Sequence, residues 1–359
     1  MSYTVSKMLR NIPRSKIVSK VEMSTTTRGG IDSLNNPTHP RYAGVRTLLR
    51  APFESDLERV DLGLIGVPFD GGVTNRPGTR YGPEGVRGAS QLVRTINQAT
   101  KVKPHDSGIR VRDVGDAVVS SPYELVGSHA EIESAFDHLV ENQVWPLSVG
   151  GDHSVTLPIL RSLNKNQRLG GPISLIHIDA HADTGENYGG SKFHHGAPFS
   201  RAVEEGLIDP KRTIQIGIRG SIADADQWKF SHDSGMRVMY MEEFSEQMRS
   251  EGGVQNIADE IYRVVGDLDT PCYLSMDIDV LDPAHAPGTG TPEIGGMTTL
   301  EAQLLLRSLG KLRNLVGADL VEVSPPFDNT GNTSMTGAMI LFEILCVAAQ
   351  AGKFPKAAA

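Results

Sequence analysis

The chain has 359 residues, of which 39% are hydrophobic, and its formal net charge is −8. This composition is ordinary for a globular protein, and an acidic chain without a long basic run argues against nucleic acid as a partner. Two cysteines, Cys272 and Cys346, are too few for a disulfide framework, and no unbroken apolar run reaches the length of a membrane span. We therefore expect a cytoplasmic protein without a membrane span.

The N-terminal region, residues 1–55, is polar and contains several prolines, so we expect an extension with little regular structure. Its first 21 residues hold five basic side chains and no acidic one. This composition is found in organellar transit peptides. It also fits a basic arm that packs on a neighbouring subunit, which is the interpretation we favour.

From about residue 60 onward, short apolar runs alternate with longer amphipathic stretches. The runs predict strands at 62–67, 146–151, 173–181, 213–218, 237–241, 272–279 and 315–324. The amphipathic stretches predict helices at 124–141, 154–166, 255–266, 299–312 and 335–350. Because continuous apolar strands separated by helices are typical of a parallel sheet covered on both faces, we predict a single α/β domain over residues 56–359.

Acidic residues and histidines gather where four of the apolar runs end. They are Asp152 and His153, then Asp179, His181 and Asp183, then Asp277 and Asp279, and finally Glu322. Ligands bind outside the carboxyl ends of the strands in open parallel sheets. We therefore expect these side chains to meet at one edge of the sheet.

Asp179, His181 and Asp183 share one face wherever the chain is extended, and residues 277–279 repeat the two-residue spacing. With His153 the set contains four carboxylates and two imidazoles. A single Asp-x-His pair is more often a turn, but acids at the ends of two very apolar runs would be costly if they were buried without partners. Two divalent cations would offset their repulsion, and this donor set suits Mn²⁺ better than Zn²⁺ while also admitting Ni²⁺.

A pair of metals at about 3.5–4 Å activates water and stabilises the tetrahedral intermediate of a hydrolysis. Phosphates, amides and amidines are all possible substrates for such a site. The spacing of the ligands alone does not choose among them.

Longer motifs identify the family. Residues 150–154 (GGDHS), 179–184 (DAHADT), 275–283 (SMDIDVLDP) and 286–293 (APGTGTPE) resemble the ureohydrolases, the arginase and agmatinase family, from about residue 60 to 347. The resemblance implies a three-layer α/β/α sandwich on a mostly parallel sheet of about eight strands. It also implies a binuclear manganese centre and hydrolysis of a guanidino group to urea and an amine.

The resemblance assigns all of the metal ligands. His153 and Asp183 would bind one metal ion, and His181 and Asp279 the other. Asp179 and Asp277 would bridge the two ions.

The resemblance also implies catalytic roles for His195, Glu322 and the ligand Asp183. His195 precedes a glycine and would carry protons to the leaving amine, with His194 as its rival. Glu322 would hold the planar guanidinium of the substrate through two carboxylate oxygens.

The substrate is harder to predict. Several stretches (66–72, 74–78, 194–199 and 321–326) resemble agmatinases and guanidino-acid hydrolases, and Tyr188 together with 241–244 and 295–298 resembles guanidinopropionases. We therefore favour an acid like 3-guanidinopropionate. Its carboxylate would be contacted at the pocket mouth by side chains from the set Thr74, Arg76, Arg80 and Tyr188. Asn187 would also bind the substrate, and Thr289, Thr291 and Glu293 would help to line the site.

Other functions stay open. Agmatine would prefer an acid such as Glu186 at the pocket mouth, and a neutral N-substituted guanidine or a biguanide would need no charged partner. Hydrolysis of 4-guanidinobutyrate is a further alternative. A phosphatase or a deacetylase is the rival enzyme class. The family resemblance implies trimers or hexamers, so the chain could also be a weakly active partner subunit of a mixed oligomer.

Overall fold

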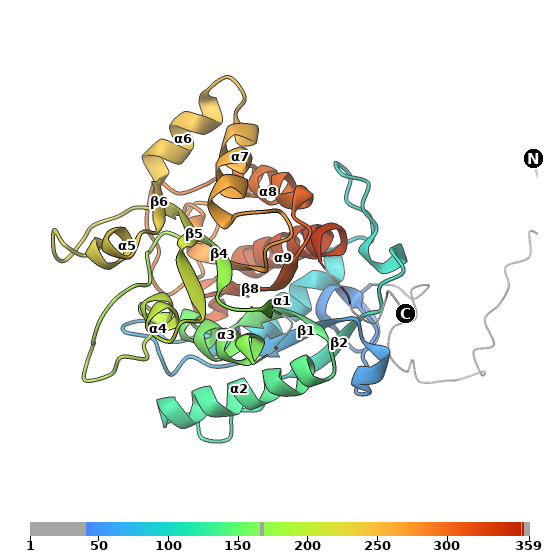
Figure 1. Cartoon of the computed structure of the whole chain (residues 1–359). Helices are drawn as coiled ribbons and strands as arrows, with labels where there is room; N and C mark the ends of the chain where they lie inside the picture. Colours follow the sequence, from blue (N-terminus) through green and yellow to red (C-terminus); the bar gives the residue numbers. More distant parts are fainter. Residues whose placement is uncertain (1–40, 166–168, 353, 355–359) are drawn as a thin grey trace, which may run out of the picture.

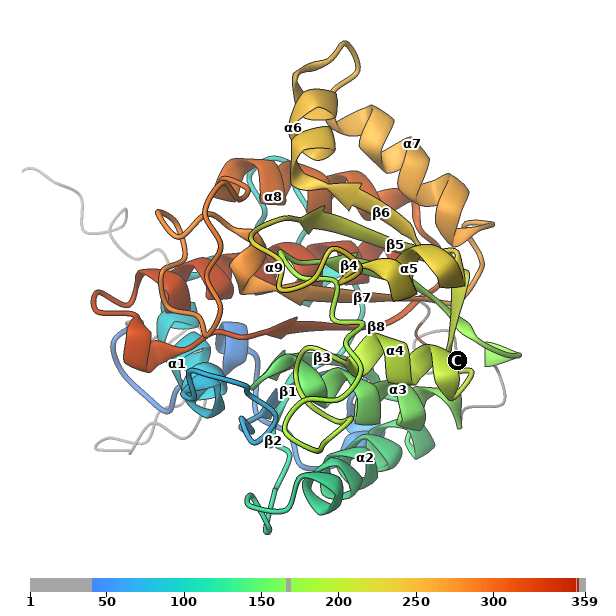
Figure 2. The same ribbon diagram turned by 90° about the vertical axis from the view of Figure 1, so that its left-hand side faces the viewer.

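The apolar runs form the strands of one sheet in the computed structural model, which describes residues 41–165, 169–352 and 354. Eight parallel strands lie in the order β2-β1-β3-β8-β7-β4-β5-β6, which Figure 2 shows from β6 to β2. They are β1 (Leu62–Val67), β2 (Val111–Asp116), β3 (Trp145–Gly150), β4 (Ile173–Ile178), β5 (Ile208–Ile218), β6 (Arg237–Tyr240), β7 (Cys272–Asp277) and β8 (Leu315–Val321).

Helices cover both faces of this sheet (Figure 1). One face packs against α1 (Gly82–Ala89), α6 (Met241–Arg249), α7 (Val254–Val265), α8 (Thr299–Ser308) and α9 (Asn332–Ala351). The other face packs against α2 (Leu125–Glu141), α3 (Thr156–Asn164) and α4 (Pro198–Glu204), and the short α5 (Lys229–Ser234) lies beside β5 and β6. The predicted three-layer α/β/α sandwich is confirmed.

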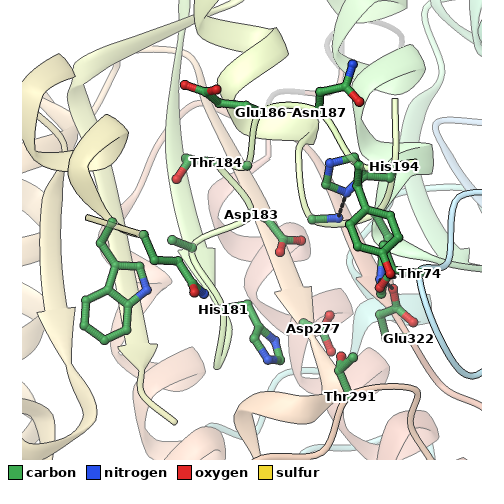
Figure 3. Close-up of a pocket in the computed structure, with 17 residues that line it drawn as sticks. Thr74, His181, Asp183, Thr184, Glu186, Asn187, His194, Asp277, Thr291 and Glu322 are labelled. Carbon is green, nitrogen blue, oxygen red and sulfur yellow. Dashed lines mark hydrogen bonds and ion pairs between the residues drawn. The ribbon is translucent and has the colours of Figure 1, made fainter. Parts of the chain in front are cut away.

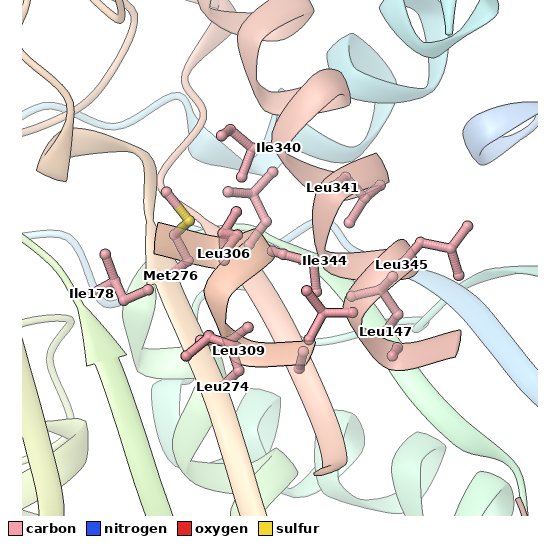
Figure 4. Packing of buried hydrophobic residues seen from close by; sticks show 14 of the residues in the cluster. Leu147, Ile178, Leu274, Met276, Leu306, Leu309, Ile340, Leu341, Ile344 and Leu345 are labelled. Atoms are coloured by element: carbon pink, nitrogen blue, oxygen red, sulfur yellow. The ribbon is translucent and has the colours of Figure 1, made fainter. Parts of the chain in front are cut away.

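The alternation of side chains along each strand supplies both cores. In β1, Leu62 and Leu64 belong to one buried cluster, whereas Ile65 and Val67 belong to the other. Figure 4 shows the first cluster, where strand residues such as Leu274 pack against α8 and α9. Each fully buried side chain of this kind contributes about 1.5–3 kcal/mol, so the cores hold the strand ends in fixed positions.

Helix α9 is the one helix of the described part of the chain that has the length and hydropathy of a membrane span. An 18-residue window in it has a mean hydropathy of 1.6, and 78% of that window is buried inside the protein. It is not an unbroken apolar run, because Glu343 and several small polar residues interrupt its sequence. Its burial is that of a core helix.

The predictions for the first 21 residues lie outside the described residues. Within residues 41–55, Leu48, Leu49 and Ala51 are buried in the core that faces α9. Phe53 pairs with Asp113 along the outer edge of β2. This stretch therefore contributes to the packing of the sandwich and covers part of an edge strand.

Candidate active site

Four strands that are neighbours in the sheet, β3, β8, β7 and β4, carry the predicted site residues just beyond or at their carboxyl ends. The strand predicted at 173–181 is shorter in the structure, because β4 ends at Ile178 and the chain then bends. Asp183 has a φ of 51° and Glu322 a φ of 62°. Such left-handed residues cost about 1–3 kcal/mol each and persist only where the surroundings hold them.

The bends bring together all six predicted metal ligands. The Nδ1 atom of His153 lies 3.0 Å from Asp183 Oδ2, 3.1 Å from Asp179 Oδ2 and 3.4 Å from Asp277 Oδ2. The Nδ1 atom of His181 lies 3.0 Å from Asp279 Oδ2 and 3.5 Å from Asp179 Oδ1. Two groups of donor atoms therefore form, one around each histidine, and Asp179 belongs to both.

The donor atoms around His153 fit a cation. The Ser275 hydroxyl donates to Asp319 Oδ1 at 2.7 Å, so its oxygen accepts a hydrogen bond from His153 Nε2 at 2.8 Å. In a neutral His153, Nδ1 therefore carries the lone pair, and it is buried without a hydrogen-bond partner among the described residues. Without a cation, the carboxylates of Asp179, Asp183 and Asp277 outweigh burial and raise the pKa of His153 well above its ordinary value, so a metal ion bound at Nδ1 would take the place of a proton there.

Burial and the neighbouring carboxylates, first Asp279 and then Asp179, raise the pKa of Asp277 well above its ordinary value. Both causes disfavour a second negative charge beside the first. A divalent cation would remove this penalty.

His195 and Glu322 lie beside this cluster. His195 Nδ1 is 2.8 Å from Glu322 Oε1, and its Nε2 is 2.9 Å from the hydroxyl and 3.2 Å from the backbone nitrogen of Thr74. Burial alone would lower the pKa of His195, but the charges on Glu322 and Asp152 outweigh it and raise the pKa to about 9. The backbone nitrogen of His153 donates to Glu322 Oε1, whereas Glu322 Oε2 is buried and has no partner among the described residues.

His195 and Glu322 line a cavity of about 360 Å³, which Figure 3 shows. Glu186 and Asn187 lie at one end of it, and His181, Asp277 and Thr291 lie at the other (Figure 3). Its remaining lining includes Thr74, Asp183, Thr184, Tyr188, His194, His195, Gln227, Trp228 and Glu322. The described lining contains carboxylates, imidazoles, amides and aromatic rings but no lysine or arginine.

Some of the predicted tail-contacting residues do not line this cavity. The Arg76 guanidinium packs over the ring of Phe327, 3.9 Å from its centroid, and Arg80 pairs with the buried Asp70. Both cations thus have partners elsewhere in the structure, and a contact of either with the substrate tail stays a prediction. Thr289 and Glu293 also lie outside the lining, whereas Thr291 lines it and donates to Asp279 Oδ2 at 3.2 Å.

Sequence reasoning missed Gln227 and Trp228, which line the cavity from the segment between β5 and α5. The available signal was their position, since they follow the carboxyl end of a strand. It was weak because the segment is polar and contains no motif. Both His194 and His195 line the cavity, and of these two histidines it is His195 that is hydrogen-bonded to Glu322.

The fold and the cluster define the class of protein: an α/β/α sandwich with a candidate metal centre at the carboxyl edge of its sheet. Residues 60–347 match the arginase family, and the chain belongs to that family. It is 50% identical over 312 residues to the guanidinopropionase of Pseudomonas aeruginosa, covering 87% of this chain and 94% of the relative. It is 45% identical over 307 residues to the mitochondrial agmatinase of Gallus gallus, covering 86% of each.

The same likeness holds in three dimensions. The proclavaminate amidino hydrolase of Streptomyces clavuligerus matches with a TM-score of 0.80 at 38% identity, covering 87% of this chain and 100% of that one. The family predicted from the motifs is therefore confirmed.

Proposed function

We propose that this protein is a binuclear-metal amidinohydrolase that hydrolyses the guanidino group of a small linear compound to urea and an amine. The observation that carries the proposal is the buried Oε2 atom of Glu322, which has no hydrogen-bond partner within the described residues and lies on the wall of the cavity beside the acid–imidazole cluster. A buried carboxylate oxygen without a partner is costly, and a guanidinium N–H would satisfy it with a charge-assisted hydrogen bond.

The metal pair would be Mn²⁺, with Ni²⁺ as the alternative, because the donors are hard oxygens with two imidazoles and no thiolate. His153 and Asp183 would hold one ion, His181 and Asp279 the other, and Asp179 and Asp277 would contact both. Bound there, two such ions lower the pKa of a water molecule and stabilise negative charge on the substrate.

His195 and Thr74 would handle the protons. The backbone nitrogen of Thr74 donates to a bare Nε2 at 3.2 Å, and the Thr74 hydroxyl, 2.9 Å away, can accept from Nε2 once the ring is protonated. The Glu322 carboxylate keeps the imidazolium stable at Nδ1. A protonated His195 on the cavity wall can supply the proton that the departing amine needs.

For the substrate we favour a guanidino acid of the 3-guanidinopropionate type. The relatives named guanidinopropionase and guanidinobutyrase support this choice. Two side-chain amides line the cavity: the Asn187 oxygen accepts from Gly190 N, and the Gln227 oxygen accepts from Ala223 N. Each amide therefore presents its NH₂ group as a donor, and with the Tyr188 hydroxyl these neutral donors can bind a carboxylate.

A second candidate is an amine such as agmatine. Glu186 lines the cavity together with Tyr188 and Trp228, and the described lining lacks a cation. A carboxylate and two aromatic faces would attract an ammonium group.

We further propose that the protein is a cytoplasmic trimer or hexamer.

Urea release by the purified chain tests the proposal. The protein is loaded separately with Mn²⁺ and Ni²⁺ and given 3-guanidinopropionate, 4-guanidinobutyrate, agmatine, arginine, guanidine, N,N-dimethylguanidine and a biguanide. Asp277→Ala, purified in parallel, controls for contaminating enzymes. Urea from one guanidino acid supports the favoured substrate, and urea from agmatine supports the second. Metal-loaded protein that releases none from any compound contradicts the proposal for the chain alone and favours a partner subunit in a mixed oligomer.

A further inference from the structure

Two buried polar residues lie behind the candidate metal centre and have no role in the function proposed above. His177 is on β4 and Gln215 is on β5, and both side chains are fully buried. The two residues are paired in the register of the parallel strands. Because unpaired polar groups are costly in such a position, we expect both side chains to be hydrogen-bonded.

The donors and acceptors in the hydrogen bonds of His177 and Gln215 can be assigned in only one way. Gln215 Nε2 lies 2.6 Å from the carbonyl oxygen of Ala182, which can only accept, so this atom is an amide nitrogen. It also lies 3.0 Å from His177 Nδ1, which must therefore accept. The ring proton of a neutral His177 is then on Nε2, which donates to Asp179 Oδ2 at 2.7 Å.

Asp179 is thus held at both of its oxygens. Oδ2 accepts from His177, while Oδ1 accepts from the backbone nitrogen of His181 at 2.6 Å. Oδ2 lies 3.1 Å from His153 Nδ1, and Oδ1 lies 3.5 Å from His181 Nδ1. Each oxygen keeps a second lone pair on the side of a different histidine, which is the orientation a carboxylate needs to bridge two metal ions.

We infer that His177 and Gln215 are positioning residues that set the orientation of Asp179 as the bridging carboxylate of the metal pair. This inference rests on the binuclear centre of the proposed function. Gln215 acts twice, because the same NH₂ group holds the carbonyl of Ala182, which lies between the ligands His181 and Asp183. One amide therefore ties the bridging carboxylate and the neighbouring ligand loop to β5.

A direct role of His177 as a ligand is the alternative. Donor atoms of His153, His177 and Asp179 lie within 4.8 Å of one another, so the composition alone would allow a metal there. However, both ring nitrogens of His177 are already hydrogen-bonded. The ring is also packed against Phe199, with centroids 4.3 Å apart, which leaves it fixed in that orientation.

The test measures metal binding rather than turnover. Wild-type protein, His177→Leu, His177→Gln and Gln215→Met are titrated with Mn²⁺, and the free ion and the coupled Mn²⁺ pair are followed by electron paramagnetic resonance. We expect His177→Leu and Gln215→Met to bind at least one Mn²⁺ about 10–100-fold more weakly and to lose the coupled signal. His177→Gln keeps an N–H donor near the Nε2 position and should stay within a few-fold of wild type.

Ile176→Val is the matched control, since Ile176 is the buried neighbour of His177 on β4 and faces the opposite core. It should bind both ions as wild type does. If the wild type binds two ions and His177→Leu binds them equally well, the inference is overturned and the proposed function stands. Loss of one nitrogen coupling in His177→Gln would also overturn it, because that would make His177 a ligand. Wild-type protein that binds no metal would overturn both.

Discussion

The His195 Nδ1 atom lies 2.8 Å from Glu322 Oε1, while the second oxygen of Glu322, on the wall of the cavity, has no partner in the part of the chain that the structure describes. One carboxylate thereby serves two purposes. Its Oε1 atom stabilises a protonated imidazole, and its Oε2 atom remains available to a cationic substrate. The two groups that the proposed reaction needs, a proton donor and a guanidinium anchor, are therefore fixed relative to each other.

Glu322→Gln separates these purposes. The amide oxygen can still accept from His195, but an NH₂ group would then face the guanidinium and repel it. We expect kcat/KM to fall about 10²–10³-fold, in line with the loss of a buried charge pair, while both metal ions stay bound. Urea-release kinetics with metal analysis check this. Glu186→Gln, a second carboxylate on the cavity wall, should have a much smaller effect on a guanidino acid, and equal losses in both variants would contradict the assignment.

His195→Ala should keep its metal and lose about 10²–10⁴-fold in kcat, the usual worth of a positioned proton donor. Because the pKa of His195 is raised to about 9, the imidazolium is present at neutral pH and is lost as the pH rises through about 9. The wild-type kcat should therefore fall above that pH, and the variant should lack this fall. His194→Ala is the control on the adjacent histidine. If it removed the alkaline fall instead, His194 would be the proton donor.

Asp277→Ala should lose metal and activity together while the fold persists. Removing one of several buried, mutually repelling carboxylates relieves the metal-free protein, so its Tm without metal should equal or exceed that of metal-free wild type. Added Mn²⁺ should raise the wild-type Tm through ligand binding to the folded state, and a chelator should reverse the rise. Thermal unfolding with and without Mn²⁺ measures both effects. A variant that showed the full Mn²⁺-induced rise would remove Asp277 from the ligand set.

Much of the sheet could be predicted because buried parallel strands read as continuous apolar runs. The strand β2 escaped because it is an edge strand in which buried and half-buried residues alternate. The short helices α1, α4, α5 and α6 also escaped. They have 8, 7, 6 and 9 residues, too few for a clear helical period in sequence.

The features of the candidate site also differ in whether the local sequence could predict them. Each metal motif is contiguous and follows a strand, so its residues could be read from local spacing. The contact of His177 with Gln215 depends on the register of β4 against β5, and the direction of Arg76 depends on Phe327, about 250 positions away in the sequence. Local patterns carry no information on either pairing, which explains why neither contact could be predicted from the sequence.

Acid stability provides a prediction that does not involve the metal centre. His129 on α2 is buried, its Nε2 lies 3.0 Å from Ser154 Oγ, and burial lowers its pKa to about 4. The unfolded chain takes up a proton at His129 near pH 6.5, whereas the folded protein does so only near pH 4. The stabilising contribution of the neutral, buried His129 is therefore present above pH 6.5 and is lost as the pH falls toward 4. The linkage costs about 2 kcal/mol of unfolding free energy at pH 5.

His129→Gln removes the titrating group, so the difference in unfolding free energy between wild type and this variant should shrink by about 2 kcal/mol from pH 7 to pH 5. Urea unfolding at both values measures it. Other groups that titrate in this range are common to both proteins and cancel in the difference. His138→Gln, an exposed histidine on the same helix, is the matched control. A difference that stayed constant with pH would show that His129 takes up its proton in the folded protein as readily as in the unfolded chain.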